Sequence, residues 1–168
     1  TLRRSSAASD VYKRQAKHYQ EVPGFSYPSG AYACVVLIDR ETGKVKVRDF
    51  FAVDDCGVVI NPLLAEGQVQ GGVAQGISQA LYEHFVYSQD GYPMTPSFFT
   101  YAIPTTMDLP SYTMDRICTP TPNNTLGAKG IGESGSVGSP PSVVNAVVDA
   151  LHFKGVRHID MPLTPEKI

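Results

Sequence analysis

The sequence predicts an α+β domain with a mixed or antiparallel sheet and two main helices. Two β-rich runs, residues 31–38 and 44–53, flank a short loop that contains Gly43, and this arrangement predicts a β-hairpin. Two later segments, residues 61–82 and 140–153, carry helix signals. Strands interleaved with helices, including a hairpin, are typical of α+β folds.

Local signals define these elements further. Residues 44–48 alternate between polar and apolar, which predicts a strand with one solvated face. Asn61 followed by Pro62 predicts the start of the first helix. Residues 112–118 also alternate and predict another strand.

The second half contains the other expected elements. Residues 85–88 look like a strand that leads into a long loop, and we expect Phe98 and Phe99 in that loop to join the core. Serine followed by two prolines predicts that the last helix begins at Pro140. Its apolar stripe predicts a buried face, formed by Val143, Val144, Val147, Val148 and Leu151. A short strand over residues 156–159 is expected to follow.

Length and composition narrow the class of protein. The chain has 168 residues, enough for one domain, and 42% of them are apolar, enough for a core. No apolar run is long enough to span a bilayer. The three cysteines lie far apart, so they indicate neither an iron–sulfur cluster nor a disulfide framework. We therefore expect a cytoplasmic protein without a membrane span.

Charge is distributed unevenly along the chain. The formal net charge is −2, yet residues 1–17 carry five basic side chains and one acidic. A basic arm can indicate nucleic-acid or membrane-surface binding. Residues 5–15, however, look like translated adaptor sequence, and such segments are set aside in fold reasoning. We expect residues 1–17 to be a non-native or disordered tail, residues 18–168 to form the domain, and no nucleic-acid partner.

A glycine-rich loop at residues 127–133 is the most informative segment of the chain. Glycines let a ligand approach the backbone closely, and the loop ends on a single carboxylate, Glu133. That carboxylate is either an ordinary surface group or a base or ligand aimed at a cofactor. Residues 130–135 match a dinucleotide fingerprint, but no strand precedes them. Lys129 is followed by glycine, so a Walker phosphate loop is excluded.

The first predicted helix carries four glycines, which are poor helix formers. Gly67 and Gly71 share one face, which suits either close helix packing or an approaching ligand. Gln68 and Gln75 also share a face, and two amides beside a bare backbone would suit the edge of a pterin.

Two other groups of polar residues are candidate metal ligands. Asp54, Asp55 and Cys56 are adjacent, and their carboxylates and thiol suggest a metal site. The four histidines show no ligand spacing.

Three ordered motifs, residues 54–62, 67–81 and 127–151, together resemble the molybdopterin-binding large subunits of molybdenum hydroxylases. This family includes xanthine dehydrogenase, aldehyde oxidase and oxidoreductase, and aerobic carbon monoxide dehydrogenase; the first and last motifs are most similar to the carbon monoxide dehydrogenase branch. The tail, residues 155–166, is similar to the family's carboxy-terminal segment. The resemblance implies that the chain is a carboxy-terminal fragment, part of the second molybdopterin-binding domain.

The resemblance also implies roles for individual residues. Glu133 would be the active-site glutamate beside molybdenum, acting as a general base on the water-derived oxygen. No side chain would be a firm molybdenum ligand, because the family's metal takes its sulfurs from the pterin. The implied cofactor-binding residues are Gly67, Gln68, Gly71, Gln75, Lys129, Gly130, Ile131 and Gly132.

The implied activity is oxidation of a carbon centre in carbon monoxide, an aldehyde or an N-heterocycle. The cofactor would be molybdopterin with molybdenum, in the cytosine dinucleotide form. A small subunit with [2Fe–2S] clusters and a medium subunit with FAD would be partners, in a dimer of heterotrimers. The isolated fragment is expected to be inactive. The alternative is a non-catalytic α+β module that keeps the fold without the cofactor.

Overall fold

The computed structural model describes residues 19, 21 and 23–168, so the predicted tail 1–17 lies outside the described residues. A three-stranded sheet has the order β1 (Ser29–Ile38), β2 (Val45–Asp55), β3 (Tyr112–Ile117). β1 and β2 are antiparallel, whereas β2 and β3 are parallel. The predicted α+β fold with a mixed sheet is confirmed.

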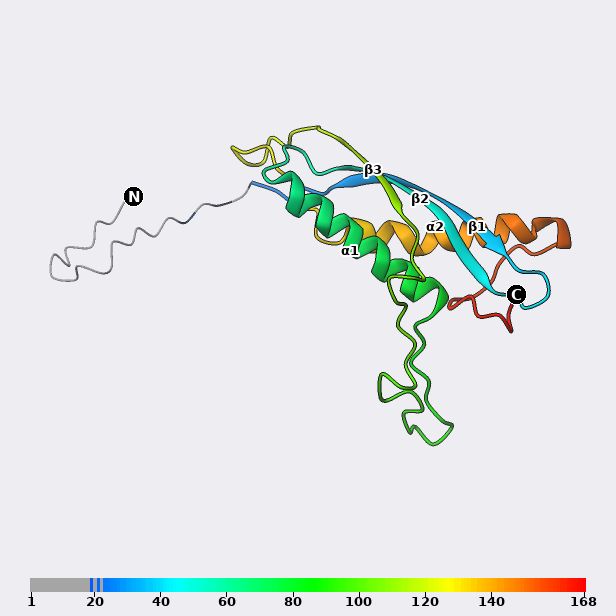
Figure 1. Cartoon of the computed structure of the whole chain (residues 1–168). Helices are drawn as coiled ribbons and strands as arrows, with labels where there is room; N and C mark the ends of the chain where they lie inside the picture. Colours follow the sequence, from blue (N-terminus) through cyan, green and yellow to red (C-terminus); the bar gives the residue numbers. More distant parts are fainter. Residues whose placement is uncertain (1–18, 20, 22) are drawn as a thin grey trace.

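Two long helices, α1 (Pro62–Leu81) and α2 (Ser134–Leu151), pack against each other and cover one face of the sheet (Figure 1). A single 3₁₀ turn, η1 (His152–Lys154), follows α2. The core lies between sheet and helices, and its most buried side chains include Val47, Phe50, Val73, Ile77, Val143, Val147 and Leu163. No helix in the described part of the chain is long and apolar enough to cross a membrane.

The hairpin and the start of α1 form as predicted. Val45 and Val47 are buried while Lys46 and Arg48 are exposed, so one face of this strand is solvated. The Leu64 N–H donates to Asn61 Oδ1 at 3.2 Å, which caps α1.

Helix α2 begins at Ser134, so the expected start at Pro140 was wrong. Pro140 and Pro141 lie inside the helix, where they cannot donate backbone hydrogen bonds. Packing explains the earlier start. Gly135 lies against α1, and a Cβ there would come within 2.8 Å of the Val73 nitrogen, so its bare backbone allows the helix to begin before the prolines. The predicted stripe is confirmed in part. Val143 and Val147 are fully buried, Val144 and Leu151 are partly buried against the core, and Val148 is only partly buried.

Two expected strands were wrong. Residues 85–88 form only an isolated bridge, between Tyr87 and Pro93. Residues 156–159 pair with no strand. Beyond them the chain turns under the end of α1, where the Leu163 N–H donates to the Ala80 carbonyl at 2.7 Å.

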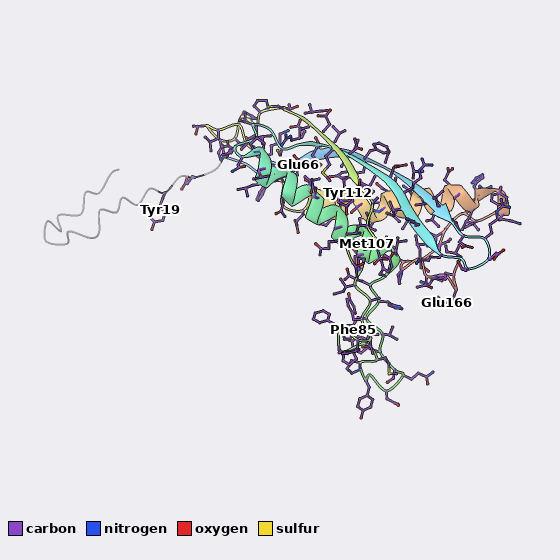
Figure 2. All side chains as sticks on the ribbon, in the orientation of Figure 1. Tyr19, Glu66, Phe85, Met107, Tyr112 and Glu166 are labelled. Carbon is purple, nitrogen blue, oxygen red and sulfur yellow. The ribbon has the colours of Figure 1, made fainter. Side chains whose placement is uncertain are left out.

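Most of the segment between α1 and β3, residues 83–111, projects from the body as a long arm, and it returns to the core at Leu109 (Figure 1). Phe98 and Phe99 are 86% and 103% exposed, so their expected place in the core was wrong. The arm carries them beyond the reach of the helices and the sheet. Figure 2 shows the side chains of this arm, with Phe85 and Met107 labelled.

Candidate functional site

The glutamate loop, residues 127–133, is fastened to the segment that follows β2. Gly57 pairs with Ala128 in an antiparallel bridge, and the Lys129 N–H donates to the Cys56 carbonyl at 2.8 Å. Gly57 has a φ of 67°, a conformation that favours glycine. The end of β2 therefore determines where this loop lies.

Asp55 holds the same junction together. Its Oδ1 atom accepts hydrogen bonds from the Gly57 N–H at 2.9 Å and the Thr119 N–H at 3.0 Å, and lies 3.3 Å from Lys129 Nζ. Hydrogen bonds from Thr119 and Gly57, with a smaller effect of Lys129, hold the pKa of Asp55 well below its usual range. The Lys129 side chain is 13% exposed, so its ammonium group is directed to Asp55 and not into open solvent.

Asp54, on the opposite side of β2 from Asp55, contacts β1 instead. The Tyr32 hydroxyl donates to Asp54 Oδ1 at 2.5 Å. Burial raises the pKa of Asp54, and the hydrogen bond from Tyr32 partly offsets this effect. Burial, together with Asp54, raises the pKa of Tyr32 far above its usual value.

These contacts bear on the metal interpretation of the Asp54–Cys56 segment. The two carboxylates point to different partners, Tyr32 and Lys129. Among residues 19, 21 and 23–168, no cluster of three or more His, Cys, Asp or Glu side chains could hold a metal ion.

Glu133 is exposed and immediately precedes α2. Its carbonyl accepts hydrogen bonds from the Val137 N–H and the Ser136 hydroxyl, both at 3.0 Å, while its side chain makes no capping bond. The carboxylate is thus free to face the adjacent groove. That groove has a volume of about 440 Å³ and is lined by residues from three segments, including Tyr27, Gly30, Tyr32, Asp54, Gly132, Glu133 and Gly138.

A second open groove, of about 410 Å³, lies on the other side of the loop. It is lined by the segment after β2, the start of α1 and the loop, including Val58, Ile60, Leu64, Gln68, Lys129, Ile131 and Gly132. Gly132 lines both grooves. Gln68 Nε2 donates to the Gly132 carbonyl at 2.7 Å, so this hydrogen bond lies where the two grooves meet.

The glycines of α1 fall into two groups. Gly72 and Gly76 face α2, and a Cβ on either would clash with that helix, so these two provide close packing. Gly67 and Gly71 face open space, with no atom within 4 Å of an added Cβ. Close packing within the described part of the chain therefore does not explain Gly67 and Gly71.

Six of the predicted cofactor residues are exposed, four on α1 and two in the glutamate loop. Gly67, Gln68, Gly71 and Gln75 are all exposed, at helical spacings that place them on one side of α1. Gly130 and Gly132 are also exposed, with no atom within 4 Å of an added Cβ. A bare backbone next to amide side chains suits a flat, polar group such as a pterin.

β1 and the residues just before it contribute a groove wall that was not predicted from the sequence. Tyr27, Gly30 and Tyr32 all line the groove beside Glu133. The predicted hairpin was a signal for Gly30 and Tyr32. Extending its strand pairing by a few residues would have placed Gly30 opposite Asp54 and Tyr32 opposite Ala52, as they are in the structure.

Comparison with known protein families gives a match over much of the chain. The model of the molybdopterin cofactor-binding domain matches residues 2–110, more than half of the chain. The chain belongs to this molybdopterin-binding family.

Similar proteins from this family cover the glutamate-loop half as well. The chain is 44% identical over 154 residues to the carbon monoxide dehydrogenase large chain of Hydrogenophaga pseudoflava, covering 92% of this chain and 19% of that protein. It is 43% identical over 142 residues to the nicotine 6-hydroxylase large subunit of Paenarthrobacter nicotinovorans, covering 84% and 17%. The chain therefore spans about a fifth of the length of these molybdenum hydroxylase subunits.

Solved structures show the same fold. A crystal structure of the Cu,Mo-CO dehydrogenase superimposes with a TM-score of 0.86 at 41% identity, covering 89% of this chain and 19% of that one. Quinoline 2-oxidoreductase from Pseudomonas putida 86 gives a TM-score of 0.80 at 44% identity, covering 82% and 18%. The fold of this molybdopterin-binding chain is thus also found within these two solved oxidoreductases.

Proposed function

We propose that this chain forms one wall of the active site in a molybdenum hydroxylase large subunit, with Glu133 as the general base. The observation that carries the proposal is the hydrogen bond between Gln68 and Gly132, which lies between two open grooves. It brings the proposed cofactor face of α1 next to the loop that ends on Glu133.

The proposed cofactor is molybdopterin with molybdenum, in the cytosine dinucleotide form. Gln68 and Gln75 offer amide groups to the pterin edge, and Gly67, Gly71, Gly130, Ile131 and Gly132 offer exposed or partly exposed backbone. Lys129 contributes indirectly, because its ion pair with Asp55 holds the glutamate loop in place. When bound, the cofactor supplies the redox centre and activates a water-derived oxygen.

The protein's own contribution is to place and move a proton. The Glu133 carboxylate accepts the proton that the oxygen nucleophile loses as it adds to the substrate carbon. The groove beside Glu133 is mostly apolar in its lining, with Tyr27, Val137 and four glycines among its residues. Such a lining suits a small substrate of the carbon monoxide, aldehyde or N-heterocycle class. Asp54 also lines this groove, but its carboxylate accepts the hydrogen bond from Tyr32, whereas the exposed Glu133 side chain makes no capping bond.

Electrons from this oxidation leave through other chains. We propose an iron–sulfur small subunit and an FAD medium subunit as partners, in a cytoplasmic dimer of heterotrimers. The 6-hydroxypseudooxynicotine dehydrogenase complex subunit gamma, 36% identical over 165 residues, is by its name one subunit of a complex. We expect the isolated chain to be inactive, because it supplies only one side of each groove.

Replacement of Glu133 by Gln in the complete enzyme tests the proposal. The variant keeps the size and polarity of the side chain but cannot accept the proton, so turnover should fall by about 100-fold or more. Molybdenum and pterin content should stay near those of the parent enzyme. Glu41→Gln, at the exposed hairpin loop at the other end of β1, is the matched control.

Two outcomes would contradict the proposal. A Glu133→Gln enzyme that turns over within a few-fold of the parent would remove the general-base role. A complete subunit that binds no molybdenum and oxidises none of the three substrate classes would favour the alternative, a non-catalytic module.

A further inference from the structure

The first turns of α2 lack two of the backbone hydrogen bonds that normally stabilise a helix. Pro140 and Pro141 have no N–H, so the carbonyls of Ser136 and Val137 lack the usual helical donors four residues later. Nearby side chains bond to other carbonyls, because the Ser139 and Ser142 hydroxyls donate to Gly135 and Gly138. The position of these turns therefore depends on the elements packed around them.

On one side, α1 provides this support. Gly72 lies against Gly135 so closely that a Cβ on Gly72 would come within 3.0 Å of the Gly135 Cα. On the other side, the aromatic ring of Tyr32, on β1, contributes to it. A Cβ on Gly138 would lie 2.5 Å from two ring carbons of Tyr32, so the ring is in direct contact with the bare backbone of α2.

The orientation of the Tyr32 ring is set on β2. Tyr32 lies opposite Ala52 in the hairpin, and Gly30 lies opposite Asp54, so Tyr32 reaches Asp54 diagonally across the pair. Its hydroxyl donates to Asp54 Oδ1 at 2.5 Å. Gly30 makes this possible, because a Cβ there would lie 2.9 Å from Asp54 Oδ1 and 3.0 Å from the ring.

We propose that Tyr32 is a positioning residue for Glu133. The hydrogen bond to Asp54 holds the Tyr32 ring against Gly138, the ring sets the place of the first turns of α2, and Glu133 immediately precedes these turns. Tyr32, Asp54, Glu133 and Gly138 all line the same groove. The inference rests on the proposed role of Glu133 for its catalytic consequence, but the positioning of α2 can be measured separately.

Tyr32→Phe in the complete enzyme tests the inference, because it removes only the hydroxyl. We expect kcat to fall by about tenfold or more, since small displacements of a catalytic group are costly, while KM and molybdenum content change less than twofold. The Val137 N–H, which donates to the Glu133 carbonyl, should exchange with solvent about tenfold faster. Amides in the remainder of α2 should be unaffected.

Two further variants serve as controls. Tyr112→Phe removes a buried tyrosine hydroxyl that has no hydrogen-bond partner in the described part of the protein, so kcat and exchange should match the parent. Asp54→Asn retains an oxygen that can accept from Tyr32 and should keep most of the parent kcat. Asp54→Val lacks that oxygen and should behave like Tyr32→Phe.

The outcomes separate this inference from the proposed function. If Tyr32→Phe matches Tyr112→Phe in kcat and in Val137 exchange, the inference is overturned, even if Glu133→Gln is inactive. Faster exchange throughout the chain would also overturn it, because that result indicates general destabilisation. If Glu133→Gln stays active while Val137 exchange responds to Tyr32→Phe, the proposed function fails and the positioning of α2 by Tyr32 stands.

Discussion

Gln68 of α1 donates a hydrogen bond from its side-chain amide to the carbonyl oxygen of Gly132, 64 residues away in the sequence. The donor lies on the exposed face of α1, and the acceptor directly precedes Glu133. One hydrogen bond thus links the proposed cofactor face to the proposed catalytic loop.

Gln68→Ala should lower the molybdenum retained per chain in the purified complete enzyme. The substitution removes the bond to Gly132 and an amide facing the proposed pterin, at a cost of roughly 1–3 kcal/mol for the groups left unpaired. Metal analysis after purification measures the effect. Gln75 lies two turns further along the same face of α1. Gln75→Ala leaves the hydrogen bond from Gln68 to Gly132 in place and should therefore have a smaller effect. Equal losses in the two variants would mean that the bond to Gly132 is unimportant.

Gly71→Ala and Gly76→Ala should change stability in opposite directions. Alanine at Gly71 meets no atom within 4 Å, so better helix propensity should raise the free energy of unfolding by about 0.5–1 kcal/mol. Alanine at Gly76 would come within 2.7 Å of Pro140 Cδ, so overpacking should lower it by roughly 1–3 kcal/mol. Urea unfolding measures both values. Gly71→Ala should also lower molybdenum retention, and normal retention would place the cofactor elsewhere.

Asp54 and Asp55 should give opposite dependences of stability on pH. Burial raises the folded pKa of Asp54 above its usual 3.8, so its charge costs stability as pH rises through that folded pKa. The advantage of Asp54→Asn over the parent should therefore be largest at neutral pH and shrink as pH falls toward 3.8. Urea midpoints across pH 3 to 7, in steps of about half a unit, measure this difference. A difference that grows in acid would contradict the prediction.

Hydrogen bonds from Thr119 and Gly57 lower the folded pKa of Asp55 below 3.8. Its stabilising effect is complete above pH 3.8 and is lost as pH falls through the lower folded pKa. Asp55→Asn should therefore be less stable than the parent by a constant amount from pH 7 to about pH 4. The same urea series checks this expectation, and a deficit that varies across that range would count against it.

Phe98 and Phe99 should contribute little to the stability of the chain. Both side chains are almost fully exposed on the arm, so replacing both by Ser should change the free energy of unfolding by less than about 0.5 kcal/mol. Ile77→Ala is the contrasting variant, because Ile77 is fully buried and its truncation should cost roughly 2–5 kcal/mol. Thermal unfolding of the two variants measures the contrast. A large loss in the Phe98/Phe99 variant would show that the arm packs on the body.

Local sequence signals predicted the elements that depend on local physics. Alternation at residues 44–48 predicted the half-solvated strand, and Asn61 followed by Pro62 predicted the start of α1. The motif around Glu133 predicted the family, which the comparisons show. These features could be predicted because hydrogen bonding at a cap and burial of one strand face involve residues close together in the chain.

Features that depend on contacts between distant residues were decided by the tertiary structure. The sequence from Ser139 to Pro141 locally favours the start of a helix. The helix nevertheless begins at Ser134, where Gly135 packs on α1. Hydrophobicity favoured the core for Phe98 and Phe99, yet the arm leaves them exposed. The hydrogen bonds from Tyr32 to Asp54 and from Gln68 to Gly132 likewise arise only once strands and helices are placed. Sequence by itself determined the family and the elements that local signals define, and only the packing of α1, α2 and β1 decided how the proposed site residues are oriented, because those contacts join residues far apart in the chain.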